Sequence, residues 1–488
     1  MTIAEALAER IAGVRYDALP EDAVHWARVA ILDTVGCTLA GASEPCALIV
    51  ARVTAAGGPC LVFGTAQRVA PLDAALINGT ASHALDFDDC SNTLGGHPSA
   101  PILPALFALA ETRAIDGRAF VAAYVAGWET ETRIARGINF YHYEKGWHPT
   151  ATIGVFGSAA ACCHLLGLTP DVTARALGLA ASFASGVKAN FGTMTKPLHV
   201  GHCSRNGLFA ALLAAEGFTA NAGAMEHPQG FLHVFNGAGN FDADAILRDW
   251  GQPWDIVQPG VAIKQYPCCG STHPAIDAML SLVREHGLTP AMVERVDSWT
   301  HPRRLAHTNR PDPQSELDAK FSVQYCLARA LLGRRVSLEH FEGDSFRDPA
   351  IRALLPRIHA APHPDMSMAS TEHFGAEVRA TLTDGRVLSA KVARPLGRGP
   401  EDPLPTELLE AKFLNCAARA LTMEAAERLL ATLRGVDSVA DMRRVTDAMV
   451  PAAALAADFR SPDSVAKGHA HHACIAYPFK AKTLTRLL

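Results

Sequence analysis

Ionisable side chains gather in four short segments of the chain that are also rich in glycine and proline. They are histidines, lysines, aspartates, a tyrosine and cysteines, which together can move protons and bind anions. Such a set suits general acid–base chemistry on an anionic substrate. The four segments are NGTASHALDFDDCSNTLGGHPSAP from Asn78, KGWHPTA from Lys145, GTMTKPLHVGHCSRNG from Gly192 and AIKQYPCCGSTH from Ala262.

Sequence motifs for other kinds of chemistry are missing. The sequence has no GxxxxGKS/T loop for nucleotide phosphates, no GxGxxG turn for a nicotinamide or flavin, no GxSxG elbow and no HExxH. His199 and His202 are spaced so that a helix could offer both to a metal, but Pro197 precedes them and no carboxylate stands at motif spacing. We therefore predict a site without metal or organic cofactor.

Several of these residues also have ordinary structural explanations. Asp88 and Asp89 could simply cap the turn that follows them. His97 and His148 each precede a proline, and such a histidine is often a loop residue. The terminal segment GHAHHAC is expected to be a chain end rather than a zinc site, and its histidines are His469, His471 and His472.

The apolar pattern indicates that helices must bring these segments together. Val24, Ala27, Ile31 and Val35 recur at spacings of three and four, which places one apolar stripe along a helix. Runs rich in alanine, glycine and leucine continue to about residue 260. Small residues of this kind are expected where helices pack closely inside a large bundle.

The pattern changes after residue 263. VERVDSWTH, from Val293, alternates apolar and polar residues and predicts a strand, while FSVQYCLARALL has helical spacing. AEVRATLTDGRVLSAKVA predicts a hairpin with Asp384-Gly385 at its turn. After the loop LGRGPEDPLP, Thr406 is predicted to cap a final helical stretch.

These elements predict a mainly α fold with two domains. A large all-helical domain is expected from both ends of the chain, residues 1–262 and 403–488. A smaller α/β lid domain, residues 263–402, is expected as an insertion between them.

The composition limits which binding partners and which cellular location are expected. The chain has 488 residues, 49% hydrophobic and 19% charged, with a net charge of −5. That balance gives no basic surface for nucleic acid or for an anionic membrane. The first residues lack the apolar core of a signal peptide, and no apolar stretch is long enough to span a membrane. With 12 cysteines and no C-x-x-C, reduced thiols and a cytoplasmic location are expected.

Five stretches spread along the chain carry a more specific pattern. They are NGTASHALDFDDC, GHPSAPILPALFALAE, GWHPTATIGVFGSAAA, GTMTKPLHVGHCSRNGLFAALLAAEGF and KQYPCCGSTHPAIDA. Together they resemble the MmgE/PrpD family, over roughly residues 5 to 450. That family includes 2-methylcitrate dehydratase, cis-aconitate decarboxylase and iminodisuccinate epimerase.

The resemblance implies a homodimer in which a helical domain and a smaller lid enclose a site for a small carboxylate, without metal or organic cofactor. By position, Asp86, His97, His148 and Lys196 match the family's active-site residues on the helical domain. Further substrate-binding or catalytic residues, implied on the lid side, are Lys264, Tyr266, Cys268, Cys269 and His307.

Within this resemblance, two positions depart from the cis-aconitate decarboxylases. Those enzymes carry a histidine two residues after the proline that matches Pro267, where this chain has Cys269. They also carry a threonine directly after the aspartate run, where this chain has Cys90. Both differences argue against decarboxylation. QYPCCGSTH also lacks the phenylalanine-proline-alanine-glutamate run of enteric-type 2-methylcitrate dehydratases.

The leading hypothesis is therefore a hydro-lyase, 2-methylcitrate dehydratase-like, that abstracts a proton next to a carboxylate of a small hydroxy di- or tricarboxylate. The alternative is an isomerase or epimerase of a small dicarboxylate, in which Cys269 or its neighbour Cys268 serves as a second base if nearby cations stabilise the thiolate. Decarboxylation of cis-aconitate and a non-catalytic scaffold are less favoured.

Each basic or acidic residue has an expected role in this chemistry. Lys196 and Lys264 would bind substrate carboxylates. His97 and His148 would serve as base and acid, because the ordinary pKa of histidine lies near neutrality. Asp86 would orient one of the two histidines.

Overall fold

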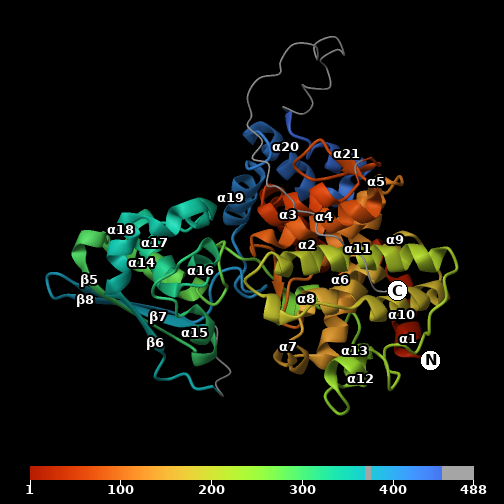
Figure 1. Ribbon diagram of the computed structural model, residues 1–488, viewed down its shortest axis with the longest axis horizontal. Helices are drawn as coiled ribbons and strands as arrows, with labels where there is room; N and C mark the ends of the chain where they lie inside the picture. Colours follow the sequence, from red (N-terminus) through yellow and green to blue (C-terminus); the bar gives the residue numbers. More distant parts are fainter. Residues whose placement is uncertain (56, 369–374, 453–488) are drawn as a thin grey trace, which may run out of the picture.

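The computed structural model describes residues 1–55, 57–368 and 375–452, and in these ranges the protein is mainly helical (Figure 1). The mainly α fold predicted from the sequence is confirmed. His469, His471 and His472 of the terminal segment lie outside the described residues.

The chain first forms a series of closely packed helices. They are α1 (Ile3–Gly13), α2 (Glu21–Gly41), α3 (Pro45–Val53), α4 (Pro71–Ala84), α5 (Ser99–Glu111), α6 (Gly117–Ile138), α7 (Tyr141–Lys145), α8 (Pro149–Thr152), α9 (Gly154–Leu165), α10 (Pro170–Phe183), α11 (Thr195–Ala215), α12 (Phe231–Asn236) and α13 (Ala243–Leu247). The apolar stripe predicted on α2 is buried along its length, from Val24 to Val35.

Two short ladders correct the expectation of a wholly helical first part. β1 (Cys60–Leu61) pairs with β2 (Arg68–Val69), and β3 (Cys90–Ser91) pairs with β4 (Val261–Ala262), both antiparallel. The second ladder ties the aspartate run to the start of the fourth chemistry-bearing segment. This ladder could not be predicted from the apolar pattern of the sequence, because each strand is only two residues long.

The next part of the chain builds a mixed sheet in the order β6-β5-β7-β8, with helices beside it (Figure 1). β5 (Val293–Thr300) pairs parallel with β6 (Ile358–Pro362) and antiparallel with β7 (Ala376–Leu382), which forms a hairpin with β8 (Val387–Val392). The predicted strand and hairpin are confirmed, and Gly385 adopts a φ of +85° in the turn. The helices of this part are α14 (His273–His286), α15 (Pro302–Thr308), α16 (Glu316–Lys320), α17 (Val323–Gly333) and α18 (Pro349–Leu354).

The last described helices return to the first part of the chain. α19 (Thr406–Ala417), α20 (Met423–Arg434) and α21 (Arg443–Asp447) share one apolar core with α2, α5 and α6. In Figure 1 these blue helices lie beside the red and orange helices of the N-terminal region. Thr406 is the first residue of α19 rather than its cap, because Pro405 occupies the capping position.

A separate apolar core lies under the sheet. It is built by residues between Tyr266 and Leu382, from α14, α17 and the strands β5 to β7. The exact domain boundaries at residues 262 and 402 stay a prediction. Among the described residues no single helix is long and apolar enough to cross a membrane, although the bent pair α2 and α3 together meets that length and composition.

A buried ion pair fastens α19 to the rest of the protein. Lys412 Nζ lies 2.5 Å from Asp33 Oδ1 on α2, with side-chain exposures of 4% and 0%. The same ammonium group donates to the carbonyl of Phe87 at 2.8 Å. A residue of α19, more than 300 positions further along the chain, thus supports the loop that carries Asp86.

Replacing Lys412 by methionine should strongly destabilise the fold, because it leaves the Asp33 carboxyl buried without its partner. Removing one partner of such a pair typically costs about 3–5 kcal/mol. Denaturant unfolding should show this loss, and the exposed Lys391→Met should not. Adding Asp33→Leu to Lys412→Met should restore part of the stability, because no buried charge then remains. Equal stability of wild type and Lys412→Met would contradict the prediction.

Candidate active site

Two helices position the first elements of the site by an unusually close crossing. A Cβ placed on Gly201 of α11 would lie 2.2 Å from the carbonyl of Leu76 on α4, and one on Gly79 would lie 2.8 Å from the Gly201 Cα. Only glycine fits such a contact between backbones. Because α4 ends just before Asp86 and α11 begins just before Lys196, this crossing brings the first and third segments together.

The loop after α4 is held by three lysines from distant parts of the chain. Lys320, Lys264 and Lys412 donate to the successive carbonyls of residues 85, 86 and 87, at 3.2, 2.6 and 2.8 Å. Asp86 has a φ of +53°, a left-handed conformation that aspartate tolerates better than most residues. The loop is therefore fixed by charge-assisted contacts rather than by regular structure.

The carboxylate of Asp86 is the meeting point of the cationic groups. Its Oδ1 lies 2.8 Å from Lys196 Nζ, 3.2 Å from Lys264 Nζ and 3.4 Å from His97 Nε2. Burial raises the pKa of Asp86, but the lysine charges outweigh this and hold it well below its usual range. Asp86 is therefore ionised at neutral pH.

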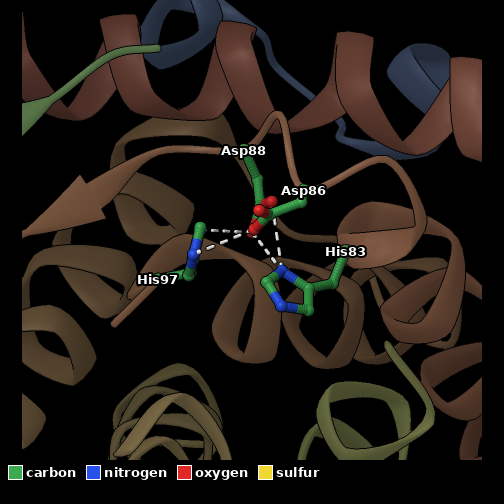
Figure 2. Close-up of side chains that lie close together, drawn as sticks. All are labelled: His83, Asp86, Asp88 and His97. Atoms are coloured by element: carbon green, nitrogen blue, oxygen red, sulfur yellow. Dashed lines mark hydrogen bonds and ion pairs between the residues drawn. The ribbon is translucent and has the colours of Figure 1, made fainter. Parts of the chain in front are cut away.

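A second carboxylate, Asp88, joins two histidines (Figure 2). Its Oδ2 lies 2.8 Å from His83 Nδ1 and 3.1 Å from His97 Nδ1. Burial lowers the pKa of His83 to about 4, so this imidazole is neutral. Burial also lowers the pKa of His97, but the charges of Asp88 and Cys90 outweigh it and raise the value to about 10. His97 is thus an imidazolium at neutral pH.

His148 has the opposite protonation state. Its backbone N–H donates to Gly186, its ring packs edge-on against Phe191 at 4.8 Å between centroids, and its side chain is buried. Its Nδ1 lies 3.3 Å from His199 Nδ1. Burial, followed by the nearby histidines and Lys196, lowers the pKa of His148 well below its usual range. His148 is a neutral imidazole that can accept a proton.

Asp86, His97 and His148 border one cavity of about 850 Å³. Its wall holds six basic side chains and two carboxylates, Asp86 and Asp318, so its charge favours an anionic ligand. Asp318 is already paired with one of the six, Arg310, at 2.5 Å. The six basic residues are Lys188, Lys196, Lys264, Arg304, Arg310 and Arg398.

The structure brings most of the predicted site residues to this cavity. The residues from that prediction that line it are Asp86, His97, His148, Lys196, Lys264, Cys269 and His307. His307 Nε2 is 3.1 Å from the hydroxyl of Ser271, in the same wall.

Two predicted substrate-binding residues lie instead in the apolar core under the sheet. Tyr266 donates its hydroxyl to Asp277 at 2.6 Å, and Cys268 Sγ lies 3.2 Å from the Thr272 hydroxyl. Both side chains are buried in that core, at 4% and 0% exposure. Cys269 alone of the adjacent pair reaches the cavity.

Sequence reasoning missed several basic residues of the cavity wall. Arg304 lies on α15, Lys188 precedes the third segment, and Arg398 stands between two glycines of the loop LGRGPEDPLP. Lys188 is held by a donated bond to the carbonyl of Tyr143 at 2.9 Å. Of these residues only Arg398 stands out in the sequence, because it is a basic residue inside a loop rich in glycine and proline.

Four neighbouring side chains lie close enough together to be considered as a metal site: His83, Asp86, Asp88 and His97. One ligand atom from each lies within 4.8 Å of the others. The carboxylates, however, already contact the ammonium groups of Lys196 and Lys264 and the His97 ring. A divalent cation would have to displace or neutralise these charges, so the donor set suits proton transfer better than metal binding.

Comparison with known proteins shows the family to which the chain belongs. The MmgE/PrpD N-terminal domain matches residues 5–244, and the MmgE/PrpD C-terminal domain matches residues 266–437. The cavity is therefore lined by residues from both matched domains.

Individual relatives include two kinds of lyase. Human cis-aconitate decarboxylase is 30% identical over 465 residues, covering 91% of this chain and 94% of the relative. Cis-aconitate decarboxylase from Aspergillus terreus is 28% identical, covering 87% and 91%. The 2-methylcitrate dehydratase of Escherichia coli K12 is 25% identical, covering 86% and 90%. With both domain models matched in order along most of its length, this chain is an enzyme that belongs to the MmgE/PrpD family.

Proposed function

We propose that this enzyme is a cofactor-independent hydro-lyase that removes water from a small hydroxy di- or tricarboxylate, as a 2-methylcitrate dehydratase does. One arrangement carries the proposal: His148 and His97 line the same cavity, in surroundings that push the pKa of His148 down and the pKa of His97 up. Loss of water needs a base for the proton next to the carboxylate and an acid for the leaving hydroxyl. Two like groups with pKa values pushed apart supply such a pair.

In this proposal His148 removes the proton. Its Nδ1 is engaged with His199, which leaves Nε2 to take the proton from carbon. His97 donates to the departing hydroxyl through Nε2, whose 3.4 Å separation from Asp86 is longer than an ordinary hydrogen bond. That N–H can therefore turn to a substrate oxygen without losing the Asp88 contact at Nδ1.

The cations hold the substrate and stabilise the carbanion. Lys196 and Lys264 stand beside the acid, and Arg304 and Arg398 line the wall formed by later parts of the chain. Arginine and lysine around a carboxylate favour the enediolate that forms when its neighbouring carbon loses a proton. A substrate with two or three carboxylates would use cations from both sides of the cavity. Closure of a lid formed by residues 263–402 over that substrate, and assembly as a homodimer, belong to the same proposal.

Decarboxylation of cis-aconitate is the second candidate, because relatives that carry this name match over most of the chain. Two features weigh against it. Cys269 stands where the resemblance places a histidine in those decarboxylases, and a thiol is a weak proton donor to carbon when compared with an imidazolium. Paired cations also stabilise a substrate carboxylate that decarboxylation would have to expel.

A panel of hydroxy di- and tricarboxylates, together with cis-aconitate, tests both candidates. The purified enzyme should form an unsaturated acid from at least one hydroxy acid, measured by ultraviolet absorbance and NMR. It should release little carbon dioxide from cis-aconitate. Rapid release of carbon dioxide with no dehydration of any hydroxy acid would overturn the proposal.

The enzyme is expected to work without a metal, because the Asp86 and Asp88 carboxylates already have cationic partners. Exhaustive chelation followed by gel filtration should leave the rate of dehydration unchanged. The matched control is the same sample treated with buffer alone. Loss of activity on chelation that is restored by a single divalent ion would contradict this prediction.

A further inference from the structure

The proposed chemistry leaves one histidine next to the cavity without a role. His199 lies near the start of α11, is half-buried, and stands outside the set of described residues that line the cavity. Its Nδ1 lies 3.3 Å from the Nδ1 of His148, with 5.5 Å between the ring centroids and 54° between the ring planes. Two lone pairs would repel each other in such a contact, so one of the two nitrogens carries a hydrogen.

A short backbone contact holds the two rings together. Trp147 and Val187 form an antiparallel bridge, and the N–H of His148 donates to the Gly186 carbonyl at 3.0 Å. The same glycine packs against His199, since a Cβ placed on it would lie 3.4 Å from His199 Nδ1. Its φ of +123° is open to glycine and rarely adopted by other residues. Gly186 therefore keeps the His148 backbone and the His199 ring next to each other.

The surroundings favour His199 as the acceptor in this contact. His199 is half-buried, and a neutral histidine in water carries its hydrogen mainly on Nε2, which leaves a lone pair on Nδ1. Burial, followed by the charges of His202 and Lys196, lowers the pKa of His199 below its ordinary value, so this ring is neutral. A neutral His199 in that tautomer accepts the hydrogen of His148 Nδ1. The lone pair of His148 is then on Nε2.

The same ring nitrogen of His97 has a partner of different charge. His97 Nδ1 lies 3.1 Å from the carboxylate of Asp88, whereas His148 Nδ1 meets an uncharged imidazole. A carboxylate favours the charged form of a histidine, while a neutral acceptor orients the ring without adding a negative charge. The partner of Nδ1 thus distinguishes the proposed acid from the proposed base.

We propose that His199 is the positioning residue of the base: it accepts the Nδ1 hydrogen of His148 and so keeps the lone pair of Nε2 available for the substrate proton. The inference rests on the proposed function and adds to it a residue outside the cavity wall.

The proton transfers balance without an added reactant. His148 Nε2 takes the proton from carbon, and the electron pair of the broken C–H bond forms the double bond as the hydroxyl leaves with the His97 proton. The Nδ1–H bond stays intact throughout. Its hydrogen bond to His199 becomes charge-assisted, which stabilises the imidazolium of His148. After the product leaves, His148 returns its proton to water and His97 takes one from water.

The tautomer of His148 can be measured in the wild type without any substrate. Protein labelled with nitrogen-15 in its histidine rings reports, by NMR correlation with the ring hydrogens on carbon, which nitrogen of each ring is protonated. The His148 signals are the set missing from His148→Ala. We expect the hydrogen on Nδ1 and none on Nε2. A wild-type His148 with its hydrogen on Nε2 would overturn the inference.

Two substitutions separate the acceptor of His199 from its bulk. His199→Phe keeps a ring without an acceptor, so the hydrogen of His148 should shift to Nε2. The kcat for dehydration of 2-methylcitrate should then fall at least about tenfold, a part of the hundredfold or more that a general base contributes. KM should be unchanged, because His199 does not line the cavity. His199→Asn places an amide oxygen near the position of Nδ1 and should keep both the tautomer and most of kcat.

His202→Phe is the matched control, since His202 is an exposed histidine three residues further along α11. It should change neither the tautomer of His148 nor kcat. 2-Methylcitrate with deuterium on the carbons next to the hydroxyl-bearing carbon adds a second readout. Its isotope effect on kcat should be at least as large in His199→Phe as in the wild type, because removal of the proton is the step that slows. A smaller isotope effect would contradict the inference.

These measurements also separate the inference from the proposed function. Equal kcat in the wild type and His199→Phe, or equal losses in His199→Phe and His199→Asn, would overturn the role of His199 and leave the hydro-lyase standing. If the wild type dehydrates no hydroxy acid, the proposed function fails, and the tautomer of His148 in the wild type and in His199→Phe still decides whether His199 sets it.

Discussion

His148→Ala is expected to lower turnover by at least about a hundredfold, in the range found for a general base. His148 is the neutral imidazole of the cavity, and its Nε2 is the nitrogen left to accept a proton from carbon. The loss should fall on kcat rather than on KM, because the ring acts in the transition state and does not bind a carboxylate. Steady-state kinetics on the dehydrated substrate, with circular dichroism to check the fold, measures it.

Lys196→Ala should lower turnover by a similar factor, but for a different reason. Lys196 Nζ contacts Asp86 at 2.8 Å and lines the cavity, so its removal takes away both a substrate cation and a partner of that carboxylate. KM should rise as well as kcat fall. Exposed residues of the same type serve as controls, and His25→Ala and Lys391→Ala should change neither value. Losses as large in the controls as in the cavity variants would place the site elsewhere.

Much of the fold could be predicted from periodicity and turn chemistry. The apolar stripe of α2 and the Asp384-Gly385 hairpin are local patterns, and both are confirmed. The β3–β4 ladder and the return of α19 to α2 are contacts between distant residues, and local pattern carries no information about them. Lys412 illustrates the difference, since nothing in the sequence around it indicates its buried contact with Asp33.

Part of the candidate site could also be predicted, because some of its residues stand in segments with a distinctive local composition. Asp86, His97 and Lys196 stand in segments whose composition marks them, and the structure places them together. The sequence treats His97 and His148 as equivalent, because both precede a proline. Their opposite protonation states arise from burial and from Asp88, which only the three-dimensional arrangement shows. Arg304 lines the cavity because α15 lies at the edge of that cavity. The residue pattern of α15 does not indicate this position.

The second large effect is expected for Asp88→Asn, although Asp88 is not among the residues lining the cavity. Asp88 accepts from His83 and from His97, and its charge is a main reason that the pKa of His97 stands at about 10. Asparagine has almost the same shape but no charge. Without that charge, burial should dominate and the pKa of His97 should fall.

The direction of the pH effect follows from that fall. The proposed acid must be protonated, and a folded-state pKa of about 10 keeps His97 charged throughout the neutral range. In Asp88→Asn the charged form should be lost at a lower pH, so the alkaline limb of kcat should move toward neutrality. At pH values above the new limb, turnover should be at least about a hundredfold below wild type, which is the contribution expected of a general acid.

Asp89→Asn is the matched control for this last variant. Burial raises the pKa of Asp89 well above its usual range, and its carboxyl accepts from Ser99 rather than from a histidine. A neutral amide in place of a neutral carboxyl should leave the alkaline limb where it is in wild type. Since Asp88→Asn also leaves buried groups with weaker partners, unfolding should be measured at each pH. A folded Asp88→Asn enzyme with an unmoved alkaline limb would show that His97 is not the acid, and a lysine of the cavity would then have to donate the proton.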